Sequence, residues 1–178
     1  MRRAVFVDRD GVVNRAVIRD GKSYPPDSLA ELEILPGVAE ALIALRKAGF
    51  LVIVATNQPD VGAGKQRREV VEAMHERLLK ELALDDIRVC YHVDADRCSC
   101  RKPLPGMLLE AARAWDIALG ESFMVGDRWR DVAAGRAAGC RTAFVDYRLE
   151  EARPEGADVI VDSLAAASRW ILGLRPPQ

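Results

Sequence analysis

Two aspartates, Asp8 and Asp10, follow a short apolar and β-branched run near the start of the chain, and Gly11 comes directly after them. The run over residues 3–7 predicts a buried strand that ends at these carboxylates. Because residues two apart in an extended backbone project to the same face, we expect the two carboxylates to converge and Arg9 to point elsewhere. Such a pair suits a hard divalent cation such as Mg2+, and it also suits a nucleophile with a proton-transfer partner. Taken alone, the motif fits a strand with a solvated acidic turn equally well.

Polar side chains also follow two further apolar runs, which cover residues 50–55 and 122–125. These side chains are Thr56, Asn57, Asp127 and Asp131. The carboxyl ends of parallel strands share one edge, which is where open α/β sheets bind ligands, so we expect all these groups to meet in one crevice. The run Arg101-Lys102-Pro103 adds fixed positive charge. Carboxylates that hold a cation, together with a hydroxyl, an amide and a lysine, describe a site for a phosphoryl group.

Three of the four cysteines and one of the two histidines gather between positions 90 and 100. They are Cys90, His92, Cys98 and Cys100. Four such ligands fit a tetrahedral structural zinc site with no position left open for water, and the alternative is an incidental cluster of reduced thiols. Arg101 and Lys102 follow the last ligand directly, so a zinc ion here would hold both cations at the crevice.

Strands alternate with helices along the whole chain. The predicted strands cover residues 3–7, 50–55, 87–90, 122–125, 141–145 and 158–161, and the predicted helices cover 36–48, 66–83, 107–115, 132–138 and 163–172. This alternation is typical of an α/β protein with a mainly parallel sheet. We expect one domain over residues 1–178, an irregular flap over 12–35 near the Asp8 edge, and a frayed tail over 175–178.

The composition limits the possible partners. Of 178 residues, 49% are hydrophobic and 30% charged, as expected of a globular chain with a substantial core. The formal net charge of -1 gives no general attraction to nucleic acid or to an anionic membrane. No segment approaches the roughly 18 uninterrupted apolar residues of a membrane span. We therefore expect a cytoplasmic monomer that binds neither nucleic acid nor membranes.

The sequence resembles the haloacid dehalogenase-like phosphatases in four motifs that together span nearly the whole chain. The motifs are Asp8-Arg9-Asp10-Gly11-Val12, Thr56-Asn57-Gln58, Lys102 and Gly126-Asp127-x-x-x-Asp131. The resemblance implies a Rossmann-like three-layer sandwich. The gaps between the motifs are short, so we expect no cap domain and an open crevice.

The resemblance also implies a reaction, the hydrolysis of a phosphate monoester. Asp8 would be the nucleophile that forms an aspartyl-phosphate, and Asp10 the acid and base that protonates the leaving oxygen and then activates water. Thr56 would hydrogen-bond the phosphoryl oxygens, and Lys102 would neutralise their charge. The Mg2+ ligands would be Asp8, the main-chain carbonyl of Asp10 and Asp127, with Asp131 as a supporting carboxylate.

The zinc loop resembles that of two capless branches of this family, the heptose bisphosphate phosphatases and the histidinol-phosphate phosphatases. The short gap between His92 and Cys98 favours the histidinol branch, whereas the run over 101–107 and the run over 36–38 favour the heptose branch. We expect removal of the C7 phosphate of D-glycero-D-manno-heptose 1,7-bisphosphate, with histidinol phosphate as the alternative substrate. The expected substrate contacts are Asn14, Tyr24, Asn57, Lys65, Arg101 and Arg128.

One departure from the heptose branch concerns the second phosphate. Heptose enzymes often place an arginine before a glycine shortly after the Thr-Asn-Gln motif, and the stretch over 59–65 lacks it. Lys65 or Arg67 is expected to replace that arginine. A non-catalytic, zinc-stabilised binding module is the alternative from another class, although the intact motifs argue against it. His75, which has charged neighbours in a predicted helix, is expected on the surface.

Overall fold

A six-stranded sheet forms the centre of the protein in this computed structural model, which describes residues 1–149 and 151–174. The strands lie in the order β5-β4-β1-β6-β7-β8, and every neighbouring pair is parallel. They are β1 (Arg3–Val7), β4 (Phe50–Asn57), β5 (Asp86–Cys90), β6 (Phe123–Gly126), β7 (Arg141–Val145) and β8 (Val159–Val161). The predicted α/β class with a mainly parallel sheet is confirmed. The frayed tail expected at 175–178 lies outside the described residues.

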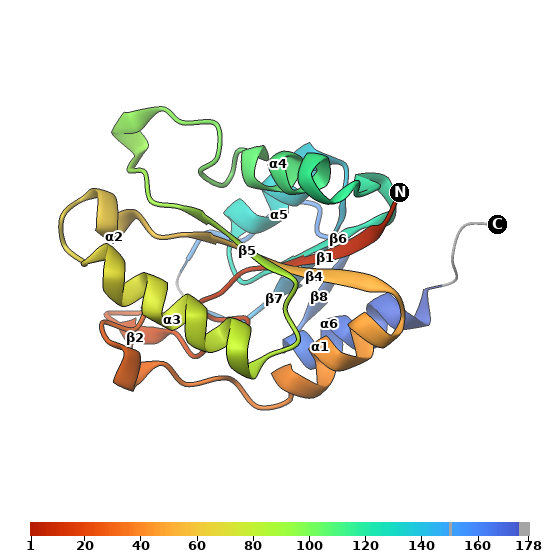
Figure 1. The fold of residues 1–178 in the computed structure, drawn as a ribbon, viewed down its shortest axis with the longest axis horizontal. Coiled ribbons are helices and arrows are strands. Elements are labelled where there is room, and N and C mark those ends of the chain that lie inside the picture. The colour runs from red at the N-terminus through yellow and green to blue at the C-terminus, as the bar shows by residue number, and fades with distance from the viewer. Residues whose placement is uncertain (150, 175–178) are drawn as a thin grey trace.

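Helices cover both faces of the sheet and give three layers (Figure 1). One face carries α1 (Val38–Lys47), α3 (Arg68–Glu81) and α6 (Leu164–Gly173), and the other carries α4 (Gly106–Trp115) and α5 (Trp129–Ala138). In β1, Val5 and Val7 pack into the core between the sheet and helices α1 and α3. Ala4 and Phe6 pack into the core between the sheet and helix α4. Alternate residues of a strand face opposite sides, so β1 is apolar on both. All four side chains are fully buried, and β1 is therefore held firmly where the first motif begins.

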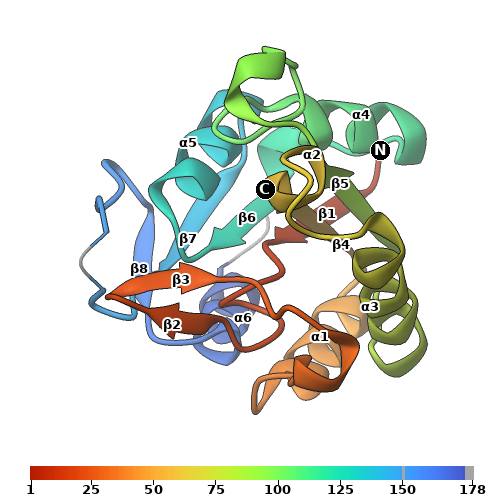
Figure 2. The same cartoon turned by 90° about the vertical axis from the view of Figure 1, so that its left-hand side faces the viewer.

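Three segments surround the carboxyl edge of the sheet. The expected flap contains an antiparallel hairpin of β2 (Val17–Arg19) and β3 (Lys22–Tyr24). A short helix, α2 (Pro59–Gly62), follows β4 directly, and the helix predicted over 66–83 is shorter, because α3 begins only at Arg68. Figure 2 looks onto the carboxyl ends of the strands, with the hairpin, α2 and the loop after β5 around them. These segments border the place where the strand-end groups meet.

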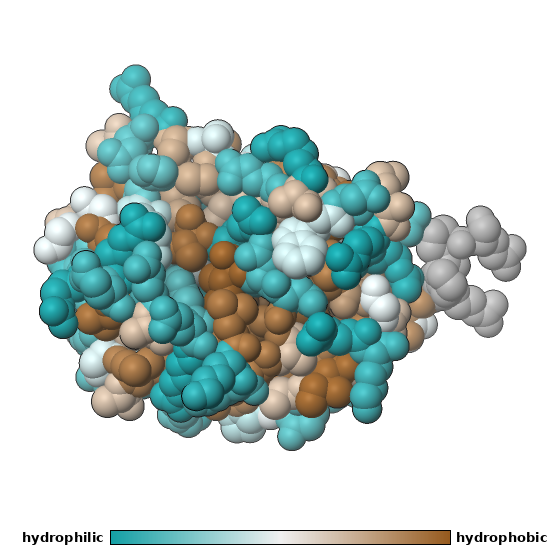
Figure 3. Space-filling model, in the orientation of Figure 1, coloured by the Kyte–Doolittle hydropathy of each residue, from teal (hydrophilic) through white to brown (hydrophobic). Residues whose placement is uncertain are grey.

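The strand β5 forms one edge of the sheet. Its first four residues are only half-buried, and the face that carries it shows a band of apolar side chains bordered by hydrophilic ones (Figure 3). Cys90, the last residue of β5, is fully buried in the core below α4. The strand thus anchors the cysteine loop in the core. None of the helices described here has the length and apolar character needed to cross a membrane.

Candidate active site

The chain turns sharply after β1, and this turn decides where the first motif points. Backbone pairing continues as far as Asp8, whose N–H donates to the carbonyl of Val125 at 2.9 Å. The N–H of Asn14 then returns to the carbonyl of Arg9 at 3.1 Å. Asp8 and Asp10 both line one cleft, but the carboxylates that lie within 4.8 Å of one another are those of Asp8, Asp127 and Asp131.

Arg9 lies against Asp10, and the prediction that it points elsewhere is wrong. Its side chain is fully buried, and Nε and Nη2 donate to Oδ1 of Asp10 at 3.1 and 3.0 Å. Its Nη1 lies 3.0 Å from Nε2 of His75 on α3. The prediction failed because β1 ends at Val7, so the alternation of a strand does not extend to Arg9.

His75 is buried, with 7% of its surface exposed, and the prediction of a surface residue is also wrong. Burial, followed by the charge of Arg9, lowers the pKa of His75 from 6.5 to about 4. The imidazole is therefore neutral near pH 7, and its Nε2 accepts the hydrogen bond from Arg9. The sequence held a signal for this: the buried residues of α3 are Val71, Met74, His75 and Leu78, a helical stripe that includes the histidine.

The carboxylate of Asp10 accepts hydrogen bonds on both oxygens. Besides Arg9, Asn14 Nδ2 donates to Oδ1 at 3.0 Å, and Gln58 Nε2 donates to Oδ2 at 2.8 Å. Burial acts to raise the pKa of Asp10, but the charge of Arg9 and these hydrogen bonds outweigh it and lower the pKa below its ordinary value. Gln58 also donates to Thr56 Oγ1 at 2.9 Å, which leaves the hydrogen of that hydroxyl free to donate. Sequence reasoning assigned Gln58 no role, although it lies within the Thr-Asn-Gln motif.

Lys102 lies at the centre of the site and is almost fully buried. Its Nζ donates to Asp8 Oδ1 at 2.9 Å, to Asp131 Oδ1 at 2.5 Å and to the carbonyl of Ala55 at 2.7 Å. Burial alone would lower the pKa of Lys102, but the two carboxylates outweigh it and raise the pKa above its ordinary value. The ammonium is therefore charged throughout the physiological range and fixes one oxygen of Asp8.

Asp127 completes a group of three carboxylates whose donor atoms lie within 4.8 Å of one another, the others being Asp8 and Asp131. Burial raises the pKa of Asp8 to about 6 and raises that of Asp127 well above its ordinary value, and the neighbouring carboxylates add to both shifts. Oδ1 of Asp127 is buried without a hydrogen-bond partner among the residues described. Three carboxylates thus share the charge of Lys102, and Asp127 keeps a free oxygen ligand, an arrangement that fits a hard divalent cation such as Mg2+.

Gly11 leaves room for the carboxylate of Asp127, and Asn57 fixes the backbone of Lys102. Gly11 has a φ of 86°, and a Cβ there would come 2.1 Å from Asp127 Oδ2, so only glycine leaves room for that carboxylate. The amide of Asn57 donates to the carbonyl of Lys102 at 3.0 Å, and its Oδ1 accepts from the N–H of Lys102 at 3.1 Å. The end of β4 therefore holds the backbone of the lysine.

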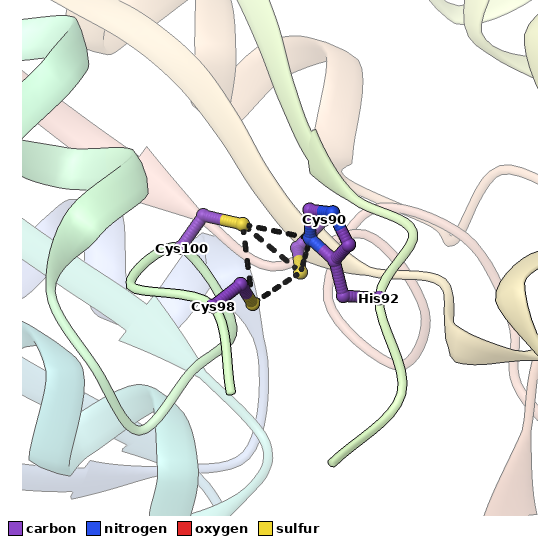
Figure 4. Close-up of side chains that lie close together, drawn as sticks. All are labelled: Cys90, His92, Cys98 and Cys100. Carbon is purple, nitrogen blue, oxygen red and sulfur yellow. Dashed lines mark hydrogen bonds between the residues drawn. The ribbon is translucent and has the colours of Figure 1, made fainter. Parts of the chain in front are cut away.

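The four predicted zinc ligands converge from two stretches of the chain (Figure 4). Cys90 and His92 come from the end of β5, and Cys98 and Cys100 from the returning loop, with all four ligand atoms within 4.8 Å of one another. The Sγ atoms of Cys90 and Cys100 lie 3.2 Å apart, and all of these cysteines are free thiols. Three sulfurs and one imidazole nitrogen at these separations fit a tetrahedral zinc ion.

The cleft at the sheet edge has a volume of about 190 Å3. It is lined by Asp8, Asp10, Ser23, Tyr24, Pro25, Asn57, Pro59, Asp60, Arg101, Lys102, Arg128, Arg130 and Asp131. Four of the expected substrate contacts are among these residues: Tyr24, Asn57, Arg101 and Arg128. Two others are not, since Asn14 is fully buried behind Asp10 and Lys65 is exposed outside the cleft. Sequence reasoning did not place Asp60 or Arg130 here, because neither belongs to a motif.

Comparison with known proteins agrees with this geometry. The model of the haloacid dehalogenase-like hydrolase family matches residues 26–139. The chain belongs to this family. The D-glycero-beta-D-manno-heptose-1,7-bisphosphate 7-phosphatase of Rhodopseudomonas palustris is 38% identical to this hydrolase over 150 residues, which are 78% of this chain and 80% of that protein. The protein of the same name from Bordetella bronchiseptica is 35% identical over 180 residues, covering 95% of this chain and 98% of the relative.

The crystal structure of D,D-heptose 1.7-bisphosphate phosphatase from B. bronchiseptica, complexed with magnesium and phosphate, superposes on this phosphatase with a TM-score of 0.80. The two are 33% identical, and the match covers 96% of this chain and 98% of the other. The enzyme described here is therefore a phosphoric monoester hydrolase of the heptose bisphosphate phosphatase family. These findings favour catalysis over the alternative of a binding module without activity.

Proposed function

We propose that this phosphatase removes the C7 phosphate of D-glycero-D-manno-heptose 1,7-bisphosphate. The observation that carries the proposal is the identity of about 35% to heptose-1,7-bisphosphate 7-phosphatases over nearly the full chain. The cleft supports it, because Arg101, Lys102, Arg128 and Arg130 line a space that also contains the proposed nucleophile Asp8. Arginine and lysine side chains are the donors that bind phosphate groups most strongly.

Asp8 is the proposed nucleophile. Lys102 holds its Oδ1, so the second carboxylate oxygen attacks phosphorus while the bond from phosphorus to the sugar oxygen breaks. Asp8, Asp127 and the main-chain carbonyl of Asp10 would hold Mg2+, with Asp131 in support. That ion supplies positive charge that screens the repulsion between carboxylate and phosphate. The Thr56 hydroxyl donates to a phosphoryl oxygen, since Gln58 occupies only its lone pair.

Asp10 is the proposed acid and base. In the free enzyme its hydrogen bonds favour the charged form, but an approaching phosphate is a like charge and raises the pKa, so Asp10 takes up a proton as substrate binds. It passes this proton to the sugar oxygen as that oxygen leaves. It then accepts a proton from a water molecule, whose oxygen attacks the aspartyl-phosphate and releases inorganic phosphate and free Asp8.

The zinc site has a structural role in this proposal. Its four protein ligands leave no open position, and it holds the loop from which Arg101 and Lys102 enter the cleft. Arg101 Nε also donates to Asp94 Oδ1 at 2.6 Å within the same loop. The zinc site would therefore fix Arg101 and Lys102 in place before substrate binds.

A substrate panel tests the proposal. Initial rates with Mg2+ are measured for both anomers of heptose 1,7-bisphosphate, histidinol phosphate, fructose 1,6-bisphosphate and an aryl phosphate. We expect kcat/KM for one heptose anomer to exceed that for every other compound by at least about tenfold. A preference for histidinol phosphate would retain the chemistry and overturn the substrate, and this alternative is kept because of the short gap between His92 and Cys98.

A further inference from the structure

Four cationic side chains line the cleft, and three of them are already engaged. Lys102 binds two carboxylates, and Arg101 pairs with Asp94. Arg128 donates from Nη2 to the carbonyl of Ser23 on β3 and lies 3.8 Å from Glu151. These three cations therefore have much of their charge and hydrogen-bonding capacity satisfied within the protein.

Arg130 is the exception. It is half-buried in the first turn of α5, and within residues 1–149 and 151–174 its guanidinium makes neither an ion pair nor a hydrogen bond to another side chain. Its Cζ lies 5.4 Å from the centroid of the Trp129 ring. A contact with an aromatic face does not neutralise the charge or use the N–H donors in the plane of the guanidinium. Arg130 is thus a cation with free donors in the wall of the cleft.

Asp60 supplies the opposite charge from another wall. It belongs to α2 and lines the same cleft, and its carboxylate has no hydrogen bond or ion pair within the described part of the chain. A carboxylate accepts hydrogen bonds from hydroxyl groups and repels phosphate. The side of the cleft formed by α2 therefore suits the sugar hydroxyls, and the side formed by α5 suits a second anionic group.

We propose that Arg130 binds the phosphate of the substrate that is not cleaved, and that Asp60 accepts a hydrogen bond from a hydroxyl of the sugar. This inference rests on the proposed function, because it requires a bisphosphate. It replaces the expectation that Lys65 or Arg67 binds this phosphate, since both residues are exposed and neither lines the cleft.

The variant Arg130→Gln tests the inference. The quantity measured is kcat/KM for a bisphosphate divided by kcat/KM for the monophosphate that lacks its second phosphate; the first pair is heptose 1,7-bisphosphate and heptose 7-phosphate. The wild-type ratio should be well above one. A lost charge-assisted pair corresponds to about 10- to 100-fold, so the variant should lower kcat/KM for the bisphosphate by that factor and leave the monophosphate within about threefold. Arg130→Lys should restore part of the ratio. Arg113→Gln, at an exposed arginine on α4 away from the cleft, is the matched control and should leave the ratio unchanged.

The outcomes separate the two proposals. If heptose bisphosphate is a poor substrate but another sugar bisphosphate shows a ratio that Arg130→Gln abolishes, the proposed function fails and the inference holds. If Arg130→Gln lowers both rates equally, or leaves the ratio at its wild-type value, the inference is overturned. A ratio that falls with Lys65→Gln and not with Arg130→Gln also overturns it, in favour of the sequence-based assignment. If no bisphosphate is preferred over its monophosphate, both proposals fail.

Discussion

Acidification should destabilise this protein through one buried residue, His75. Burial and the charge of Arg9 lower the pKa of His75 to about 4, against 6.5 for an ordinary histidine. Between these two values the unfolded chain binds a proton at this position and the folded protein does not. The free energy of unfolding therefore decreases as the pH falls from 6.5 to 4, because the unfolded chain gains a proton at His75 and the folded protein does not. Outside this range His75 adds no pH dependence.

The size of the effect follows from the two pKa values. Lowering the pH from 7 to 5 should cost about 2 kcal/mol through His75 alone, since each unit of pKa difference corresponds to about 1.4 kcal/mol. His75 is 7% exposed, so solvent does little to reduce this value. His75→Gln is the natural comparison, because the amide oxygen can still accept from Nη1 of Arg9 but does not titrate.

Urea denaturation of both proteins at pH 7 and at pH 5 measures the effect. Every other titrating group contributes to both proteins, so the informative quantity is the difference between their two losses of stability. We expect the wild type to lose about 2 kcal/mol more than His75→Gln. Equal losses would refute the assignment of a neutral imidazole held against Arg9.

Three further predictions concern the site itself. Asp8→Asn should lower kcat by at least about 1000-fold, with an unchanged circular dichroism spectrum, because no carboxylate remains to attack phosphorus; hydrolysis at the wild-type rate would exclude Asp8 as the nucleophile. Gly11→Ala places a Cβ 2.1 Å from Oδ2 of Asp127 and forces that carboxylate to move. The Mg2+ concentration for half-maximal activity should then rise about tenfold or more, and an unshifted titration would contradict this. Protein purified without chelator should contain about one zinc per chain by mass spectrometry, and Cys98→Ser should lower both the zinc content and the melting temperature. Zinc-free protein with reduced thiols and the same melting temperature would remove the structural role of the loop.

The features that the sequence predicted correctly depend on short-range patterns. The parallel sheet follows from apolar runs that alternate with helical stripes, and Asp8, Thr56 and Asp127 follow the ends of such runs. Parallel pairing then brings these ends to one edge wherever the helices pack. The Cys/His cluster could also be predicted, because its four residues lie between positions 90 and 100 and need no long-range folding to meet.

The features that the sequence did not reveal depend on contacts between distant segments. Arg9 and His75 are 66 residues apart, and their hydrogen bond requires both the turn after β1 and the rotation of α3 about its axis. The apolar pattern of the sequence defines the buried face of α3 only to within about one residue. An uncertainty of that size decides whether His75 lies on the surface or in the core. Arg130 was missed for a similar reason, since only the placement of α5 beside the cleft distinguishes it from an ordinary surface arginine.

The paired hydrogen bonds between Asn57 and the backbone of Lys102 have a consequence for the evolution of this protein. They hold the end of the cysteine loop directly to β4, and its start is anchored by Cys90 in the core. The interior of the loop, between residues 94 and 98, is thus tethered on both sides and transmits little strain to the lysine. Insertions there can accumulate or be grafted without displacing the Lys102 ammonium. The loop is therefore the place where a lineage of such enzymes can acquire a lid, a docking segment or a new specificity while the chemistry stays constant.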